Sequence, residues 1–163
     1  MSNIKVQILM STYNGEKYIK KQLDSIMKQD IPISIHIRDD GSSDKTVDII
    51  KEYEACYDNI SHTEGNNIGV VKSFFELFKE ASDDADYIAL ADQDDIWFTD
   101  KIRRAVKALL KNKQDEFEWF RLDICKIGDQ KQDENLRIVT IYQIEDHQNI
   151  QLKYLQREDF YQA

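Results

Sequence analysis

The sequence has few of the residues that cross-link, kink or anchor a chain. Its 163 residues include one proline, five glycines and two cysteines, Cys56 and Cys125, which are far apart and have no partner at metal-ligand spacing. We therefore expect two reduced thiols rather than a disulfide or a zinc site. No stretch approaches the roughly eighteen consecutive apolar residues of a membrane-spanning helix, and no apolar signal-peptide core precedes the first strand-like segment. The expected localisation is cytoplasmic.

Positive charge is also in the minority. The chain has 22 Lys and Arg against 31 Asp and Glu, which gives a net charge of −9. This balance argues against a general nucleic-acid binder, because such proteins need a basic stripe to neutralise phosphates. An acidic protein can still bind an anionic nucleotide when a divalent cation lies between its carboxylates and the phosphates.

Short apolar segments alternate with helical stripes along the first two-thirds of the chain. Strands are predicted over residues 4–10, 33–38, 59–62 and 87–91. The first helix is predicted over about 16–29, and a second follows Ser42–Asp44 with the buried stripe Val47, Ile50 and Tyr53. A third helix has the buried stripe Val71, Phe74, Phe75 and Phe78, and a fourth begins at Thr99 or Asp100 with the buried stripe Ile102, Ala105, Val106 and Leu109. This alternation predicts an α/β fold, in which a mostly parallel sheet has helices on both faces.

The composition changes near residue 113. Residues 114–163 contain eight glutamines against four in the first 113, with no proline and a single glycine. Within them we predict a strand over 136–144 and a helix over 146–161. We therefore divide the chain into a half-domain over 1–112 and an atypical polar tail over 113–163.

Two acidic clusters follow predicted strands, Asp39-Asp40 and Asp92-Gln93-Asp94-Asp95. Ligands bind at the carboxyl ends of the strands in open α/β sheets. Asp92 and Asp94, at i and i+2 of an extended segment, project to the same side, and hard cations such as Mg²⁺ or Mn²⁺ prefer such oxygen ligands. The sequence predicts a metal site there, with a polar loop that caps the next helix as the alternative.

Three other loops have both a structural and a functional interpretation. Residues 39–44 are typical of a tight turn before a helix, although Asp40 has the chemistry to accept a hydrogen bond from a nucleobase N–H. Ser11–Asn14 offers hydroxyls and an aromatic face on which a base could stack. Lys72 has the reach to contact a phosphate, or it is a solvated surface lysine.

Four segments together resemble family 2 glycosyltransferases in order and spacing. They are residues 8–15 (Ile-Leu-Met-Ser-Thr-Tyr-Asn-Gly), 37–44 (Ile-Arg-Asp-Asp-Gly-Ser-Ser-Asp), 67–71 (Asn-Ile-Gly-Val-Val) and 91–97 (Ala-Asp-Gln-Asp-Asp-Ile-Trp). The resemblance covers about two-thirds of the chain. It extends to the bacterial rhamnosyltransferases of cell-wall and capsular polysaccharide synthesis, in which Asp-Gln-Asp-Asp-Ile-Trp is usual.

The resemblance implies a GT-A fold and an inverting, metal-dependent transfer from a dTDP- or UDP-sugar, with rhamnose from dTDP-rhamnose as the expected donor. By matched position, it implies that Asp94 and Asp92 bind the metal and that Asp40 hydrogen-bonds the pyrimidine. The expected nucleotide-sugar-binding residues are Ser11, Tyr13, Asn14, Asp39, Asp40, Lys72, Asp92 and Asp95. The implied acceptor is a glycan or a lipid-linked glycan, which would bring the protein to the inner face of the membrane, although no basic amphipathic helix indicates membrane binding.

The general base that inverting transfer requires is not identified. In the family it comes from the second half of the domain; here Asp146 is a weak candidate, because it follows Asp94 by only 52 residues and lacks family-like flanks. We hypothesise that the gene is truncated or frame-shifted after about residue 113. The hypothesis fails if the other two reading frames of the downstream DNA encode no family-like continuation.

Three rival interpretations remain open. The chain could bind nucleotide sugars without transferring them. A nucleotidyltransferase would need a glycine-rich triphosphate loop after the first strand, and residues 11–15 contain one glycine. A phospho-accepting signalling domain would have its acid pair after the first strand rather than the second.

Overall fold

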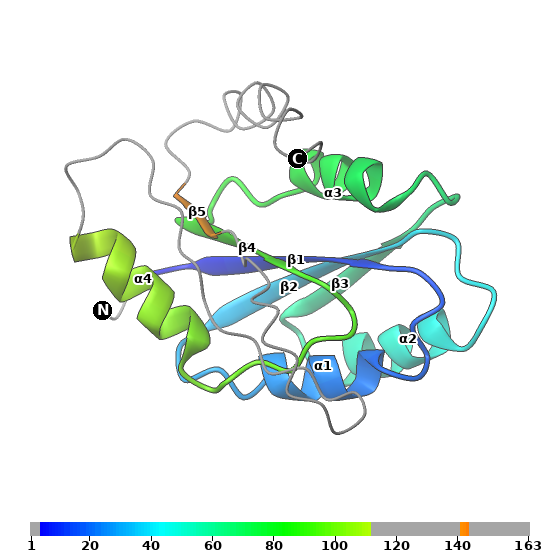
Figure 1. Ribbon diagram of the computed structural model, residues 1–163, viewed down its shortest axis with the longest axis horizontal. Helices are drawn as coiled ribbons and strands as arrows, with labels where there is room; N and C mark the ends of the chain where they lie inside the picture. Colours follow the sequence, from blue (N-terminus) through cyan, green and yellow to red (C-terminus); the bar gives the residue numbers. More distant parts are fainter. Residues whose placement is uncertain (1–3, 112–140, 144–163) are drawn as a thin grey trace, which may run out of the picture.

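The computed structural model describes residues 4–111 and 141–143, which form one sheet with helices on both of its faces (Figure 1). In chain order the elements are β1 (Val6–Thr12), α1 (Ile19–Ile26), β2 (Ile33–Asp39), α2 (Thr46–Cys56), β3 (Ile60–Glu64), α3 (Val70–Lys79), β4 (Tyr87–Ala91), α4 (Lys101–Lys111) and β5 (Ile141–Gln143).

The strand order is β3-β2-β1-β4-β5. β1 pairs in parallel with β2 and with β4, β2 pairs in parallel with β3, and the short β5 runs antiparallel to β4. The chain thus builds outward from β1 to β3 and then crosses back to place β4 on the other side of β1. This reversal makes a topological switch point between β1 and β4, where open α/β sheets bind their ligands. The predicted mostly parallel sheet is confirmed.

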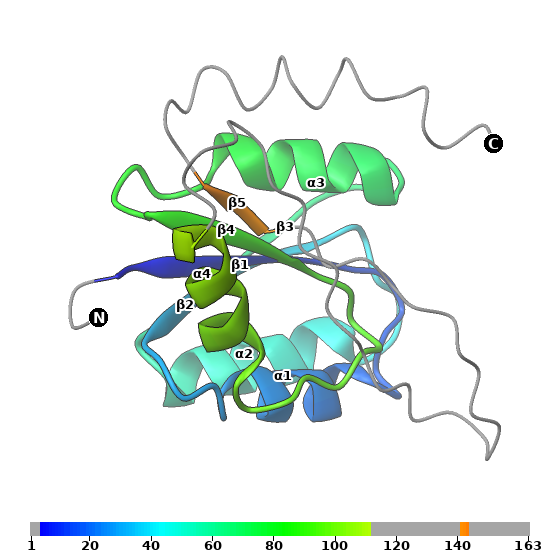
Figure 2. The same cartoon turned by 60° about the vertical axis from the view of Figure 1, so that its left-hand side comes forward.

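β1 is buried along its whole length and supplies both hydrophobic cores. Val6, Ile8 and Met10 contribute to the larger core, which α1, α2 and α4 cover. Leu9 points to the opposite face, where the core includes Phe74, Leu77 and Phe78 of α3. Alternate residues of a strand point to opposite faces, so one apolar strand can fill two cores. Figure 2 shows α3 on one side of the sheet and α1, α2 and α4 on the other.

Two helices face the sheet differently from their predicted stripes. Thr46, Ile50 and Tyr53 are the buried residues of α2, whereas Val47 is only partly buried. In α3, the predicted stripe residue Val71 is 49% exposed. Ser73 and Phe74 are buried on the face of α3 that packs against the sheet. A helix of three turns can rotate by a fraction of a turn without losing its apolar face, so periodicity alone did not determine which residues are buried.

The bounds of several elements differ from those predicted from the sequence. β1 continues to Thr12, and α1 is shorter than the predicted 16–29. Only residues 141–143 of the predicted strand over 136–144 are described, and the predicted helix over 146–161 lies outside the described residues, as does Cys125. Cys56 is an exposed free thiol, as expected. None of the helices in the described part of the chain has both the length and the apolar character needed to cross a membrane.

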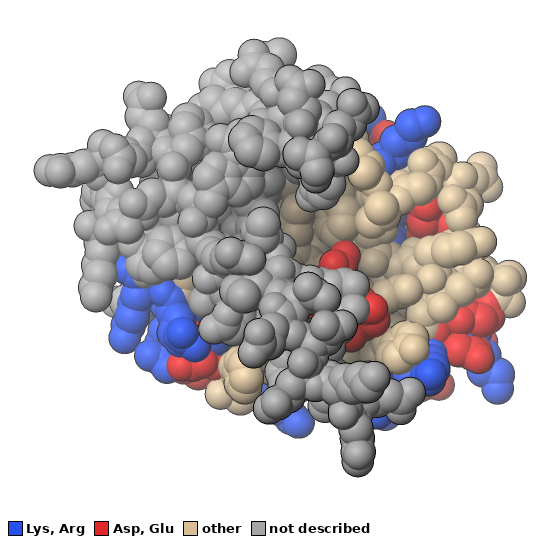
Figure 3. Space-filling model, viewed as in Figure 1, with Lys and Arg blue, Asp and Glu red and all other residues tan. Residues whose placement is uncertain are grey.

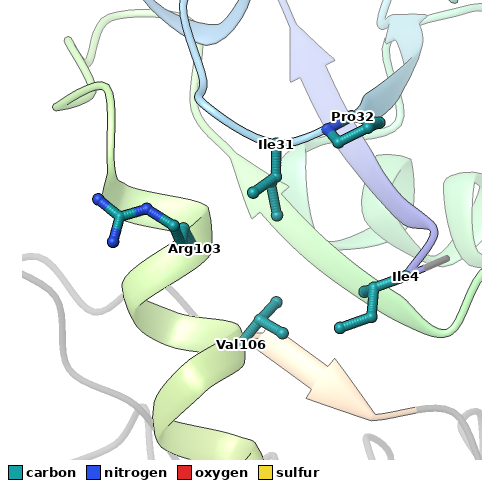
Figure 4. Close-up of a pocket in the computed structure, with 5 residues that line it drawn as sticks. All are labelled: Ile4, Ile31, Pro32, Arg103 and Val106. Carbon is teal, nitrogen blue, oxygen red and sulfur yellow. The ribbon is translucent and has the colours of Figure 1, made fainter. Parts of the chain in front are cut away.

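A small pocket lies at the amino ends of β1 and β2, opposite the edge where the acidic loops are found. Ile4, Ile31, Pro32, Arg103 and Val106 line it (Figure 4). Its lining is mostly aliphatic, and Arg103 is paired with Asp30. It lacks the convergent polar groups of a nucleotide site.

The two faces of α3 predict different costs of truncation. Leu77→Ala removes a fully buried side chain and should lower the free energy of unfolding by about 2–5 kcal/mol. Val71→Ala, on the exposed face of the same helix, should change it by no more than about 0.5 kcal/mol. Urea unfolding followed by circular dichroism measures both, and equal midpoints for the two variants would contradict this packing.

Candidate active site

Four loops meet at the carboxyl edge of the sheet. They follow β1, β2 and β4 and precede α3, and they contain the motifs that the sequence singled out. In the space-filling view, acidic surface lies near the middle of the molecule, beside the place where β4 ends in Figure 1 (Figure 3).

Asp39 holds the turn between β2 and α2. Its buried carboxylate accepts hydrogen bonds from the Thr12 hydroxyl (2.9 Å), the Gly41 N–H (3.1 Å), and the Ser42 N–H and hydroxyl (2.7 and 2.6 Å). Gly41 has φ +82°, a conformation that favours glycine, and a Cβ there would lie 3.0 Å from the Asn67 nitrogen. Asp39 thus determines the shape of the loop, and direct contact with a nucleotide stays a prediction.

Asp40 anchors the start of α3. Its carboxylate, 2% exposed, accepts from the Ile68 N–H (3.1 Å to each oxygen) and the Gly69 N–H (2.8 Å), and it lies 3.5 Å from the Arg38 guanidinium. A Cβ on Gly65 would lie 2.3 Å from the Arg38 guanidinium, so a larger residue there would displace that group. These partners hold the loop over residues 65–69, and a hydrogen bond from Asp40 to a pyrimidine stays a prediction.

The loop after β1 is joined to its neighbours by main-chain hydrogen bonds. Asn14, at φ 47°, donates its N–H to the Ser42 hydroxyl (2.8 Å) and accepts from the Ser43 N–H (2.8 Å). The Ser11 hydroxyl donates to Ser73 of α3 (2.7 Å). The Tyr13 ring is 46% exposed at the same edge, as a base-stacking ring would have to be.

Gln93 joins the loop after β4 to the loop after β1, a role that the sequence analysis missed. Its side-chain amide accepts from the Tyr13 N–H (2.9 Å) and donates to the Tyr13 carbonyl (3.0 Å). A Cβ on Gly15 would lie 2.3 Å from the Gln93 Oε1, so a larger residue there would displace the Gln93 amide. Residues 93 and 94 form a turn rather than the extended segment predicted after β4. The i, i+2 alternation of a strand therefore does not describe this loop, and it could not have identified the role of Gln93.

The acidic loop after β4 contains one buried and two partly exposed carboxylates. Asp95 is 2% exposed, whereas Asp92 and Asp94 are partly exposed. Among the described residues, no group of three acidic, His or Cys side chains is arranged to hold a metal by itself. Two accessible carboxylates instead fit an Mg²⁺ or Mn²⁺ whose remaining ligands are diphosphate oxygens and water.

A buried lysine lies behind this loop, and the sequence analysis missed it too. The side chain of Lys101, the first residue of α4, is almost fully buried with its Nζ 3.9 Å from the centroid of the Trp97 ring. Burial lowers the pKa of Lys101 to about 7, and the negative charges of Asp95 and Asp92 oppose that shift. The main-chain N–H of Trp97 donates to the Ser25 hydroxyl (3.0 Å), which attaches the loop to α1.

Two predicted residues lie apart from this network. Lys72 is exposed in the first turn of α3, close in sequence to the Gly69 that Asp40 holds. Asp146, the candidate base, lies outside the described residues.

The contact between Gly15 and Gln93 predicts that mutations at the two positions have non-additive effects on the free energy of unfolding. Gln93→Ala removes two hydrogen bonds, each contributing about 0.5–1.5 kcal/mol to the free energy of unfolding. Gly15→Ala should be more destabilising in the wild type than in the Gln93→Ala background, where the colliding amide is absent. Urea midpoints of the two single variants and the double variant test this, and simple additivity would be the contrary result.

Comparison with known proteins gives matches along most of the chain. A model of Glycosyl transferase family 2 matches residues 7–159. The dTDP-rhamnosyl transferase RfbG of Shigella flexneri is 44% identical over 108 residues, which are 63% of this chain and 37% of that protein. The poly(ribitol-phosphate) beta-N-acetylglucosaminyltransferase TarS of Staphylococcus aureus is 32% identical over 96 residues, which are 56% of this chain and 16% of that protein. The chain therefore spans 37% or less of the length of these two relatives.

Solved structures have the same architecture. S. aureus TarS 1–349 in complex with UDP-GlcNAc gives a TM-score of 0.61 at 27% identity, covering 68% of this chain and 32% of that one. The mannosyltransferase PcManGT from Pyrobaculum calidifontis, in complex with GDP-Man and Mn²⁺, gives 0.61 at 22% identity, covering 70% and 33%, and so shows a common fold. With the parallel sheet, the acidic loop at its switch point and the family match over residues 7–159, this chain belongs to glycosyltransferase family 2 and has a GT-A fold.

Proposed function

We propose that this chain provides the donor-binding half of an inverting, metal-dependent glycosyltransferase that transfers rhamnose from dTDP-rhamnose to a bacterial surface polysaccharide. The observation that carries the proposal is the partly exposed pair Asp92 and Asp94 at the carboxyl end of β4, next to the β1 loop at the switch point. The 44% identity to a dTDP-rhamnosyl transferase supports rhamnose as the transferred sugar.

The nucleoside is expected to bind against the loops after β1 and β2. The exposed face of Tyr13 offers a stacking surface. Asn14 and Asp39 hold the surrounding main chain through the hydrogen bonds described above, and the Ser11 hydroxyl is bonded to that of Ser73. Asp40 would contact the pyrimidine either directly or through the main chain at Gly69 that it holds. Lys72, exposed in the first turn of α3 and apart from the hydrogen-bonded loops, is the proposed phosphate contact.

The diphosphate is expected to lie over the loop after β4. Asp92 and Asp94 would hold an Mg²⁺ or Mn²⁺ ion there, which would neutralise the charge that develops on the departing diphosphate. Asp95 would support the loop from beneath, because its side chain is buried while those of its two neighbours are partly exposed. The Gln93 amide is hydrogen-bonded to the main chain of Tyr13, so these bonds connect the proposed base and diphosphate subsites.

The acceptor side of the reaction rests on residues that the structure does not describe. Inverting transfer requires a carboxylate that takes the proton from the acceptor hydroxyl, and Asp146 is the candidate that the sequence offers. The proposed acceptor is a glycan or a lipid-linked glycan, with the protein in the cytoplasm or at the inner face of the membrane. Donor binding without transfer would assign the chain to the alternative function, a nucleotide-sugar-binding remnant.

Calorimetric titration with dTDP and UDP, each with and without Mn²⁺, tests the donor site. Binding of dTDP should require Mn²⁺ and should weaken by about tenfold or more in Asp94→Ala, since losing even an outer-shell partner of a metal typically costs that factor. Asp58→Ala is the matched control, because Asp58 is exposed in the turn between α2 and β3, at the opposite edge of the sheet. Equal affinities of wild type and Asp94→Ala for dTDP would overturn the metal assignment.

The same titrations decide the nucleotide. We expect dTDP to bind more tightly than UDP in the presence of Mn²⁺, as a dTDP-rhamnose donor requires. Tighter binding of UDP would indicate that the donor is a UDP-sugar rather than dTDP-rhamnose. The assignment of the donor site would still hold.

A further inference from the structure

The connection between the acidic loop and α4, residues 97–102, is hydrogen-bonded to the end of α1. Gln29, three residues after α1, donates from its side-chain amide to the Phe98 carbonyl (2.8 Å). The oxygen of the same amide accepts from the Ile102 N–H (3.0 Å) in the first turn of α4, where main-chain N–H groups have no partner within a helix. One glutamine therefore holds both the middle and the end of this connection.

Two further residues hold the same connection. The buried Ser25 hydroxyl accepts from the main-chain N–H of Trp97 (3.0 Å). The Asp30 N–H donates to the Thr99 carbonyl (3.0 Å). Residues from the end of α1 thus bond to the connection at its start, its middle and its end, and they bond to its main chain throughout.

These bonds fix one end of the acidic loop. β4 ends at Ala91, which is paired with Met10 of β1, and Trp97 begins the connection that Ser25 holds. Only residues 92–96 lie between these two fixed points, and they include the carboxylates of the proposed metal pair. A functional group on so short a segment is placed by what holds the ends of the segment.

We propose that Gln29 and Ser25 are positioning residues for the divalent cation, which hold the acidic loop in the arrangement that Asp92 and Asp94 need to share one ion. The proposal rests on the donor-site function given above. Both residues act through the main chain of the connection, so they contribute to the site without binding the ion themselves. Misplacing a functional group by about 1 Å can cost about a hundredfold in rate, so a distant hydrogen bond can matter to the site.

Titration with MnCl₂ in the presence of saturating dTDP tests the effect on the metal. Gln29→Met keeps the length of the side chain and removes both amide hydrogen bonds, and Ser25→Ala removes the acceptor of the Trp97 N–H. We expect the Kd for Mn²⁺ to rise by about tenfold in each variant, the lower end of the loss typical when an outer-shell partner of a metal is removed. A variant whose Kd for Mn²⁺ equals that of the wild type would overturn the role of its residue. If Gln29→Met does not fold, Ser25→Ala decides the question.

Gln7→Met is the matched control for a general loss of stability. Gln7 is a second buried glutamine whose amide oxygen accepts from a main-chain N–H, that of Ser82 (2.7 Å). Ser82 precedes β4, at the opposite edge of the sheet from the acidic loop. Gln7→Met should lower the urea midpoint, as Gln29→Met should, and should leave the Kd for Mn²⁺ unchanged. Equal weakening of Mn²⁺ binding by both substitutions would overturn the proposal.

Hydrogen exchange of the free protein, followed by mass spectrometry, tests the positioning without any ligand. In Gln29→Met, the main-chain amides of residues 92–97 should exchange several-fold faster than in the wild type, because the end of the loop is no longer held. In Gln7→Met, these amides should exchange as in the wild type. Unchanged exchange over residues 92–97 in Gln29→Met would overturn the proposal.

The two measurements separate the failure of this proposal from that of the proposed function. If the wild type does not bind Mn²⁺ even with dTDP present, the metal-dependent donor site fails, and hydrogen exchange still decides whether Gln29 holds the acidic loop. If the wild type binds Mn²⁺ with dTDP and the variants bind it equally well, the donor site stands and the positioning role is wrong.

Discussion

The carboxyl edge of this sheet is ordered by buried carboxylates that accept hydrogen bonds from the main chain of neighbouring loops. Asp39 accepts from the turn that follows it, and Asp40 accepts from the two residues that precede α3. Each carboxylate satisfies N–H groups that would otherwise be unpaired at a strand end or a helix start. Removing either acid would leave several donors unsatisfied at once, so the shape of the proposed nucleoside subsite depends on these two side chains.

The second acidic cluster is built on the opposite principle. Asp92 and Asp94 remain partly exposed, whereas Asp95 is buried in the same loop and Lys101 is buried with its Nζ over the Trp97 ring. One cluster therefore shapes loops, and the other has two partly exposed carboxylates, although both look like runs of aspartate in the sequence.

Side-chain amides couple the two clusters. Gln93 holds the main chain of Tyr13, and Asn14 holds the start of the loop that contains Ser43. The loops after β1, β2 and β4 are consequently one hydrogen-bonded unit rather than three independent segments. A ligand that spans a base and a diphosphate would contact all of it. The Gln93 amide also lies where a side chain at position 15 would be, so the unit favours glycine there.

Much of this protein could be predicted from its sequence, because the relevant signals are local. Apolar periodicity located the helices and strands of residues 4–111, and the alternation of strand and helix predicted a parallel sheet with helices on both faces. The order of four short motifs was sufficient for the family. The presence of acids at two strand ends, and hence a site at the carboxyl edge, also followed from local pattern, since every parallel strand presents its end to the same edge.

The tertiary structure decided which of these residues shape the site and which face outward. Whether a carboxylate holds a loop or stays accessible depends on donors distant in the sequence, as with Asp40 and Gly69, or on an amide such as Gln93 that pairs with Tyr13 from a different strand end. The burial of Lys101 likewise depends on how α4 packs against the loop after β4. Local pattern cannot determine these pairings, because they arise only when strands distant in the chain are brought side by side and each buried polar group must find a partner.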